Sequence, residues 1–310
     1  MSSVSSASHP LPAPAAARRN ALALAAVTMG NVIWGFTFLF TRVALRTTDP
    51  AVMLSLRFVV AFLLLNVLLL TGHEKVSFRG KNPKGILALT VTEIAYFYFE
   101  SYGVLYTNAT FSGMVLAVSP IVAIVLAMVF LKEYPTRRQA LFCILPVVGV
   151  MLIVSAGKTL GVITPIGALF LLCSCLTSGA YKTANRKAAE EFSPFERTYV
   201  MIGGCALVFT AAALFTTRGD ASLWLSPLHT PAALACILAL ACLGSIAANM
   251  LVNYSAGILP VVKVSTFAAL CTLVTMVAGV LILHEPMSAL GLVGAALIIV
   301  GIFQVSKSAS

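Results

Sequence analysis

Long apolar runs alternate with short polar breaks along the whole chain. Proline, glycine and charged residues gather in the breaks, as at Asp49-Pro50, Glu133-Tyr134-Pro135 and Ser193-Pro194. An α-helix needs about 20 mainly apolar residues to span a bilayer. The pattern therefore predicts ten membrane-spanning helices, at residues 21–45, 51–71, 85–107, 108–131, 138–156, 162–183, 195–216, 231–252, 258–283 and 287–305.

Composition agrees with this pattern. Of 310 residues, 60% are hydrophobic and only 10% are charged, whereas a soluble domain carries roughly 25% charged residues. The apolar runs show no period-two alternation of the kind that marks the strands of a membrane barrel. We therefore predict an all-α polytopic membrane protein whose solvent is the lipid bilayer.

The net charge of +10 arises mainly from basic residues that the pattern places in loops and tails. The loops and tails expected on one side of the membrane hold most of the basic residues: Arg18, Arg19, Lys75, Arg79, Lys81, Lys84, Lys132, Arg137, Arg138, Lys182, Arg186, Lys187, Arg197 and Lys307. The other side holds Arg42, Arg46, Arg57, Lys158 and Arg218. The positive-inside rule then predicts that both termini are cytoplasmic and argues against a nucleic-acid partner. Residues 1–20 are expected to form a disordered cytoplasmic tail.

The two halves of the chain share spaced residues, which indicates an internal duplication. Gly35, Arg42 and Pro50 recur 144 residues later as Gly179, Arg186 and Pro194. Leu131-Lys132-Glu133 recurs 152 residues later as Leu283-His284-Glu285, and Tyr102 as Tyr254. We expect a first repeat at 21–156, a second at 157–306 and a tail at 307–310. Because five helices per unit is an odd number, the second repeat would be inverted, as in many secondary transporters that alternate access to a central cavity.

Three ionisable residues lie deep within the predicted helices: Glu93, Glu100 and Lys263. Such residues are costly in lipid and usually face a cavity or a partner. Glu93 and Glu100 are two helical turns apart, and Tyr96 lies on the same face. We expect the carboxylates to meet an amino group of a solute and Lys263 to meet its carboxylate. A purely structural pair of Glu93 with Lys263 is the alternative.

Polar and aromatic residues of other helices are further candidates for the cavity wall. Trp34 lies in mid-helix, away from the membrane interfaces where tryptophan is enriched. Asn31, Ser119, Ser178, Tyr181 and Asn249 lie on the expected helices 1, 4, 6 and 8. The same groups can instead join helices by hydrogen bonds, and the sequence leaves that alternative open. Pro120 and Pro260 are candidate hinges, because proline interrupts the helical hydrogen bonds.

Enzyme chemistry finds no support in the sequence. Both aspartates, Asp49 and Asp220, fall in predicted loops, and neither H-E-x-x-H nor a phosphate-binding G-x-x-x-x-G-K-[ST] motif is present. The seven cysteines fall in apolar runs, without metal-ligand spacing, and are expected to be free thiols. We predict neither an enzyme nor a cofactor or metal site.

The sequence resembles a known transporter group. Asn31-Val32-Ile33-Trp34-Gly35-Phe36-Thr37-Phe38, Asp49-Pro50 with Arg57-Phe58, Ser119-Pro120, and the helix endings at Glu133 and Glu285 are similar to the EamA family of the drug/metabolite transporter superfamily. The tyrosine-rich third helix with Glu93 looks most like the exporters of amino acids, aromatic ones in particular. The resemblance implies an exporter of the bacterial cytoplasmic membrane, with helices 1–4 and 6–9 around the cavity and helices 5 and 10 at the periphery.

The expected function is therefore the export of amino acids and related small metabolites. Export of amphiphilic cations or drugs is one alternative, although the first helix holds no acidic residue. Carriage of nucleotide sugars or sugar phosphates is another, although phosphate would need several cations at depth. The expected partners are a small-molecule solute and lipid. Proton coupling and oligomeric state stay open, a monomer included.

Overall fold

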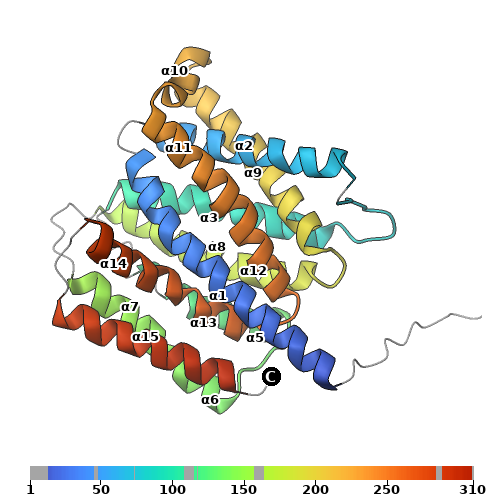
Figure 1. The fold of residues 1–310 in the computed structure, drawn as a ribbon, viewed down its shortest axis with the longest axis vertical. Helices are drawn as coiled ribbons and strands as arrows, with labels where there is room; N and C mark the ends of the chain where they lie inside the picture. The colour runs from blue at the N-terminus through green and yellow to red at the C-terminus, as the bar shows by residue number, and fades with distance from the viewer. Residues whose placement is uncertain are drawn as a thin grey trace, which may run out of the picture.

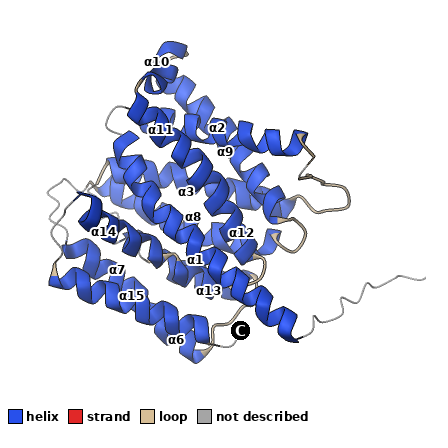
Figure 2. Cartoon of the chain, viewed as in Figure 1, coloured by secondary structure: helices blue, strands red, loops and turns tan. Residues whose placement is uncertain are grey.

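The computed structural model describes residues 13–44, 48–72, 74–107, 115–116, 118–156, 164–283 and 288–308. Their regular secondary structure is entirely helical (Figures 1 and 2), as the sequence predicted. The first half contains α1 (Ala13–Ala44), α2 (Pro50–Leu70), α3 (Lys84–Leu105), α5 (Ser119–Phe130), α6 (Arg137–Phe142) and α7 (Ile144–Ala156). The second half contains α8 (Pro165–Ala188), α9 (Pro194–Thr216), α10 (Ala221–Leu225), η1 (Ser226–His229), α11 (Pro231–Ala239), η2 (Leu240–Ala248), α12 (Asn249–Ala256), α13 (Val261–Phe267), α14 (Ala269–Leu283) and α15 (Ala289–Lys307).

Seven helical stretches of the described chain are long and apolar enough to cross a membrane. They are α1, α2, α6 with α7, α8, α9, α11 through α12, and α15. The other three expected spans fall on helices that are shorter or more polar, namely α3, α5 and α13 with α14. Many large apolar side chains point outward, such as Phe215 and Leu70, which are 86% and 85% exposed. In a bilayer these side chains would contact lipid.

Helix starts follow the polar breaks. Asp49 caps α2 through a hydrogen bond from the Ala51 amide, 2.9 Å long, and Pro50 occupies the first turn. Ser193 and Glu196 form a capping box at the start of α9. Proline suits the first turn because it lacks an N–H that would be unsatisfied there anyway. The same reason accounts for Pro120, which lies in the first turn of α5 rather than in mid-helix. Pro260 immediately precedes α13, as expected.

Helices of the first half pack mainly against helices of the second half (Figure 1). α2 packs against α9, and α3 packs against α8. α1 lies against α11, η2, α12 and α14, while α5 lies between α8 and α13. At one edge of the molecule, α7 packs against α15. The core is therefore shared between the halves.

Two glycines allow equivalent close approaches. A Cβ at Gly35 of α1 would lie 2.6 Å from Val274 of α14, and a Cβ at Gly179 of α8 would lie 2.7 Å from Val122 of α5. Gly35 and Gly179 are the residues that the repeat pairs at an offset of 144, and Val122 and Val274 are 152 apart. The two contacts thus follow the two offsets found in the sequence.

Several basic residues that we counted with the loops and tails lie within helices. α8 continues to Ala188 rather than ending at 183, so Arg186 and Lys187 are helical as well as Lys182. Arg57 of α2 and Arg197 of α9 are 7% and 1% exposed. Arg197 lies among polar groups: it donates to the carbonyl and side-chain oxygens of Asn185 and to the carbonyl of Asn253.

The ends of the chain also differ from the expectation. α1 begins at Ala13, within the predicted tail 1–20, so Arg18 and Arg19 are helical; residues 1–12 lie outside the described part of the chain. At the other end α15 includes Lys307.

All seven cysteines are free thiols.

Candidate functional site

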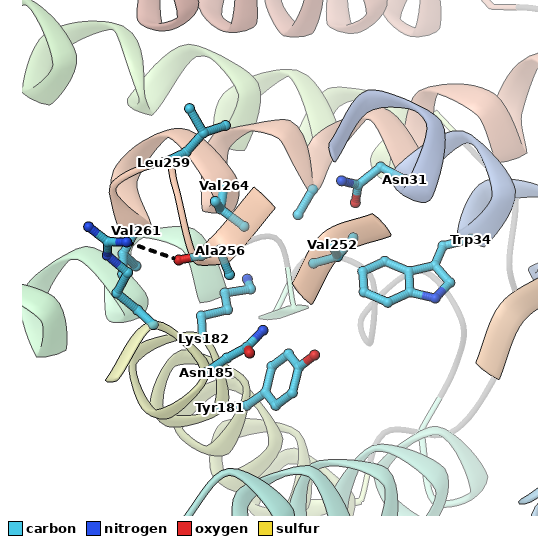
Figure 3. A pocket seen from close by; sticks show the side chains of 12 residues that line it. Asn31, Trp34, Tyr181, Lys182, Asn185, Val252, Ala256, Leu259, Val261 and Val264 are labelled. Carbon is cyan, nitrogen blue, oxygen red and sulfur yellow. Dashed lines mark hydrogen bonds between the residues drawn. The ribbon is translucent and has the colours of Figure 1, made fainter. Parts of the chain in front are cut away.

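A small cavity, about 30 Å³ in volume, lies between helices of the two halves (Figure 3). α1 comes from the first half, and α8, α12, α13 and the segment between α12 and α13 come from the second. The lining residues are Asn31, Trp34, Tyr181, Lys182, Asn185, Arg186, Val252, Ala256, Leu259, Val261, Val264 and Ala268. One part of this wall is aliphatic, while α1 and α8 contribute the aromatic and polar groups.

On the α1 side, Asn31 and Trp34 are one turn apart and both face the cavity (Figure 3). The indole nitrogen of Trp34 donates to the carbonyl of Gly244, 3.1 Å away, which leaves its rings against the cavity. The Asn31 amide nitrogen donates to the carbonyl of Val27 at 2.7 Å. Its Oδ1 atom is buried without a hydrogen-bond partner among the described residues. The α1 side therefore offers an aromatic surface and one unused acceptor.

On the α8 side, Tyr181 and Lys182 face Asn31 and Trp34 across the cavity (Figure 3). The Tyr181 hydroxyl is also buried without a hydrogen-bond partner in the described chain. Lys182 Nζ lies 3.3 Å from Ser119 Oγ of α5. No carboxylate of the described residues lies within ion-pair distance of Lys182. The α8 side therefore presents a cation whose charge is unbalanced nearby.

Arg186, one of the lining residues, belongs to an ion pair beside the cavity. Arg186 of α8 donates to Glu133 at 2.7 Å and to the carbonyl of Ala256 at 3.2 Å. The second carboxylate oxygen of Glu133 accepts from the amide of Val261, at the start of α13. Glu133, which follows α5, thus connects the C-terminal end of α8 with the N-terminal end of α13.

The element η2 supplies carbonyl oxygens beside the cavity. It is a π-helix, a rare form that is frequent at functional sites. Its Gly244 carbonyl accepts from Trp34 and, at 3.3 Å, from the side chain of Asn249. Ser245 of η2 accepts a hydrogen bond of 2.8 Å from Arg57 Nε. This element therefore links Trp34 of the cavity wall to Arg57 of α2.

A cluster of charged residues lies next to the cavity. Arg57 interacts electrostatically with Glu93 and Glu100, and Tyr96 interacts with both carboxylates. The guanidinium also lies over the ring of Phe97, 5.4 Å from its centroid. Glu93 interacts with Tyr181 as well, which places the cluster beside the α8 wall. Arg57 is therefore a cation that acts electrostatically on Glu93, and we did not expect it.

The structure brings together only part of the set named from the sequence. Asn31, Trp34 and Tyr181 line the cavity, and Ser119 contacts Lys182. Asn249 shares the carbonyl that Trp34 uses. Ser178 is buried about one turn before Lys182 on α8, whereas Glu93, Tyr96 and Glu100 belong to the adjacent cluster. Lys263 is buried on α13 but is not among the lining residues.

Sequence reasoning missed Lys182, Asn185 and Arg57. The stretch Lys182 to Lys187 contains three basic residues, and we counted all three with the cytoplasmic loops although the expected span 162–183 contains Lys182. A helix that starts at Pro165 reaches a full membrane span of about 20 residues near Ala184, so Lys182 is still close to membrane depth. That length argument was available from the sequence.

Comparison with known proteins identifies related chains over nearly the full length. The model of the EamA-like transporter family matches residues 21–155 and again residues 165–307. The protein named "Uncharacterized transporter YcxC" of Bacillus subtilis is 35% identical over 281 residues, which cover 89% of this chain and 90% of that protein. An "Uncharacterized transporter" of Archaeoglobus fulgidus is 22% identical over 278 residues, covering 88% and 95%.

One solved structure also shares the fold. A crystal structure titled only "Crystal structure of protein" superimposes with a TM-score of 0.75 and covers 91% of this chain and 95% of its own. The sequence identity is 15%. At this identity the likeness extends to the arrangement of the helices alone.

Proposed function

The chain belongs to the EamA-like transporter family, and from this premise we propose that it exports amino acids and related small metabolites across the bacterial cytoplasmic membrane by alternating access. The observation that carries the proposal is the cavity between the two halves, with Lys182 on its α8 wall. The carboxylates of Glu93 and Glu100 lie in the adjacent cluster. Lys182 and the unused acceptor Asn31 Oδ1 suit the carboxylate and the ammonium group of a zwitterion.

Alternating access needs two similar halves that can rock against each other around a fixed site. Two observations support inverted repeats in this chain. The family model matches the chain twice, once in each half. The contacts of Gly35 with Val274 and of Gly179 with Val122 follow the repeat offsets and exchange partners between the halves. In this scheme the Arg186–Glu133 pair closes the cytoplasmic end of the cavity.

The buried cations favour a carboxylate over a phosphate. Arg57 interacts electrostatically with Glu93 and Glu100 and donates to Ser245. Arg197 is hydrogen-bonded to Asn185 and Asn253, and Arg186 is paired with Glu133. Lys182 is the cavity residue that brings a positive charge without a carboxylate partner in the described chain. One cation fits a monoanion, whereas phosphate groups are usually held by several.

The same lysine counts against lone cations as cargo. An amphiphilic cation in this cavity would meet the like charge of Lys182, and in a medium of low dielectric that repulsion is strong. A zwitterion brings its own carboxylate and avoids the cost. Amino-acid export is therefore the function that the charges favour among the three alternatives.

Flux through proteoliposomes tests the proposal. Purified protein would be reconstituted, the vesicles loaded with each of the common amino acids in turn, and exchange against the same labelled amino acid measured. We expect saturable exchange for a subset with apolar side chains. Leu292→Ala, an outward-facing change on α15, serves as the variant control. Exchange no faster than in protein-free vesicles for the entire panel would reject the proposal.

A further inference from the structure

On the premise of that transport function, we infer that Lys182 binds the carboxylate of the solute and that this carboxylate, rather than the amino group, is the required recognition element. The ligand class is small amino acids and monocarboxylates with an apolar body. Lys263, the cation expected from the sequence, lies outside the lining of the cavity.

The first step concerns the charge of Lys182. Its ammonium group lies 3.3 Å from the hydroxyl of Ser119, a neutral partner. A buried charge normally has an opposite charge or several hydrogen bonds to offset its desolvation. In the described part of the chain no carboxylate fulfils this role for Lys182. An anionic ligand in the cavity would complete the site.

The second step concerns the atoms that hydrogen bonding leaves unused. Asn31 is 1% exposed and Tyr181 is 6% exposed, and each has one polar atom without a partner among the described residues. Buried polar atoms are otherwise almost always satisfied, so these exceptions need an explanation. Both residues line the same cavity as Lys182 and face it from opposite walls (Figure 3). A bound solute satisfies both.

The third step assigns the groups of the solute. The Tyr181 hydroxyl can donate, and it is next to Lys182 in sequence, so it suits the second carboxylate oxygen. Asn31 Oδ1 can only accept, because its amide nitrogen is engaged by Val27, so it suits an ammonium group. Trp34 and the aliphatic residues Val252, Leu259 and Val264 then contact the apolar side chain. Carboxylate, amine and side chain each have a separate place.

The test uses four compounds of one shape: L-leucine, 4-methylpentanoate without the amino group, 3-methylbutylamine without the carboxylate, and L-leucinamide with the carboxylate neutralised. Binding to the purified full-length protein would be measured by competition with labelled L-leucine. We expect leucine and 4-methylpentanoate to compete, with the amine and the amide weaker by about tenfold or more, the scale of a lost charge-assisted hydrogen bond. Equal competition by 3-methylbutylamine or leucinamide would overturn the inference.

Variants locate the effect. Lys182→Gln should weaken leucine binding about tenfold or more, and Lys182→Arg should restore part of it because the charge returns. Lys187→Gln is the matched control, since Lys187 lies on the same helix with an exposed side chain paired to Glu190. A monodisperse Lys182→Gln protein that binds leucine with the parental affinity would refute the role of Lys182.

A measurement on the unaltered protein covers the case of a variant that does not fold. Acylation of lysines by an amine-reactive reagent would be followed by mass spectrometry. Leucine and 4-methylpentanoate should slow the labelling of Lys182 and leave Lys187 unchanged, and equal labelling of Lys182 with and without them would contradict the inference. Leucine binding that depends on Lys182, without any flux, would reject the transport function but not this site. Leucine flux that is unchanged in Lys182→Gln would support the transport function and reject this site.

Discussion

Arg186 Nε and Glu133 Oε1 lie 2.7 Å apart, and this ion pair joins α8 of the second half to the segment after α5 of the first half. The carboxylate also accepts from the amide of Val261, while the guanidinium donates to the carbonyl of Ala256. The two side chains are 28% and 24% exposed, so the pair is neither fully desolvated nor freely solvated. Its strength therefore suits a contact that would form and break in the proposed alternating access.

Glu133→Gln should loosen this end of the cavity. The charge of Arg186 would remain, but the charge-assisted part of the bond, about 1 kcal/mol for a partly exposed pair, would be lost. Backbone amides at 182–188 and 256–262 should then exchange with deuterium several-fold faster. Glu190→Gln is the control, because Glu190 pairs with Lys187 on the exposed face of the same helix. Identical exchange in both variants would show that the pair does not hold the end closed.

Removing Arg57 should destabilise the protein through the charges left behind. Arg57→Leu would remove the cation that acts on Glu93 and Glu100 and would also remove the buried hydrogen bond to Ser245, a loss of about 1–3 kcal/mol. We expect a clear fall in the thermal midpoint in detergent, and partial recovery when Glu93→Gln is added. Lys84→Leu, at the exposed start of α3, should change the midpoint little. A double variant no more stable than Arg57→Leu alone would mean that Glu93 and Arg57 are not coupled.

The glycine contacts predict matched effects in the two halves. At Gly35 and Gly179 a new Cβ would lie 2.6 and 2.7 Å from Val274 and Val122, so alanine at either position must push two helices apart. Overpacking of this kind costs about 1–3 kcal/mol. Gly85→Ala is the control, because its nearest neighbour would be at an ordinary contact distance of 3.4 Å. Thermal midpoints of the three variants would decide; stability in Gly35→Ala equal to that of Gly85→Ala would contradict the tight contact.

Topology can be checked from the C-terminus. Basic residues near Lys132 and Lys187 and the inverted-repeat scheme both require Ser310 to face the cytoplasm. A reporter that is active only in the cytoplasm should work when fused after Ser310 and fail when inserted at Gly219, in the turn between α9 and α10. A periplasmic signal at Ser310 would remove the proposed inversion of the halves.

Much of the fold could be predicted because it depends on local chemistry. Apolar runs predict helices in a bilayer, and Asp49-Pro50 and Ser193-Pro194 mark starts that the structure confirms. Trp34 was identifiable because tryptophan in mid-membrane needs a partner for its N–H, and the Gly244 carbonyl provides it.

The charged residues were harder because their surroundings come from distant parts of the chain. Arg57 lies near the start of its helix, and nothing nearby in sequence reveals Ser245 or Glu93 as partners. Lys182 was not recognised as a cavity residue, because the neighbouring Arg186 and Lys187 resemble a basic loop. The π-helix η2 could not be predicted either, because its nine residues, which mostly have small apolar side chains, show no change in the period of the hydrophobic pattern.

The exchange of helix partners between the halves has a consequence for biogenesis. α1 and α2 leave the ribosome long before α9, α12 and α14, against which they pack. Until those helices are inserted, Arg57 and Asn31 lie in the membrane without their final neighbours. An insertase or chaperone that shields polar faces would be needed during that interval. A chain cut between Ala156 and Thr164 would yield two fragments, each inactive alone, which could assemble only when both are made in the same cell.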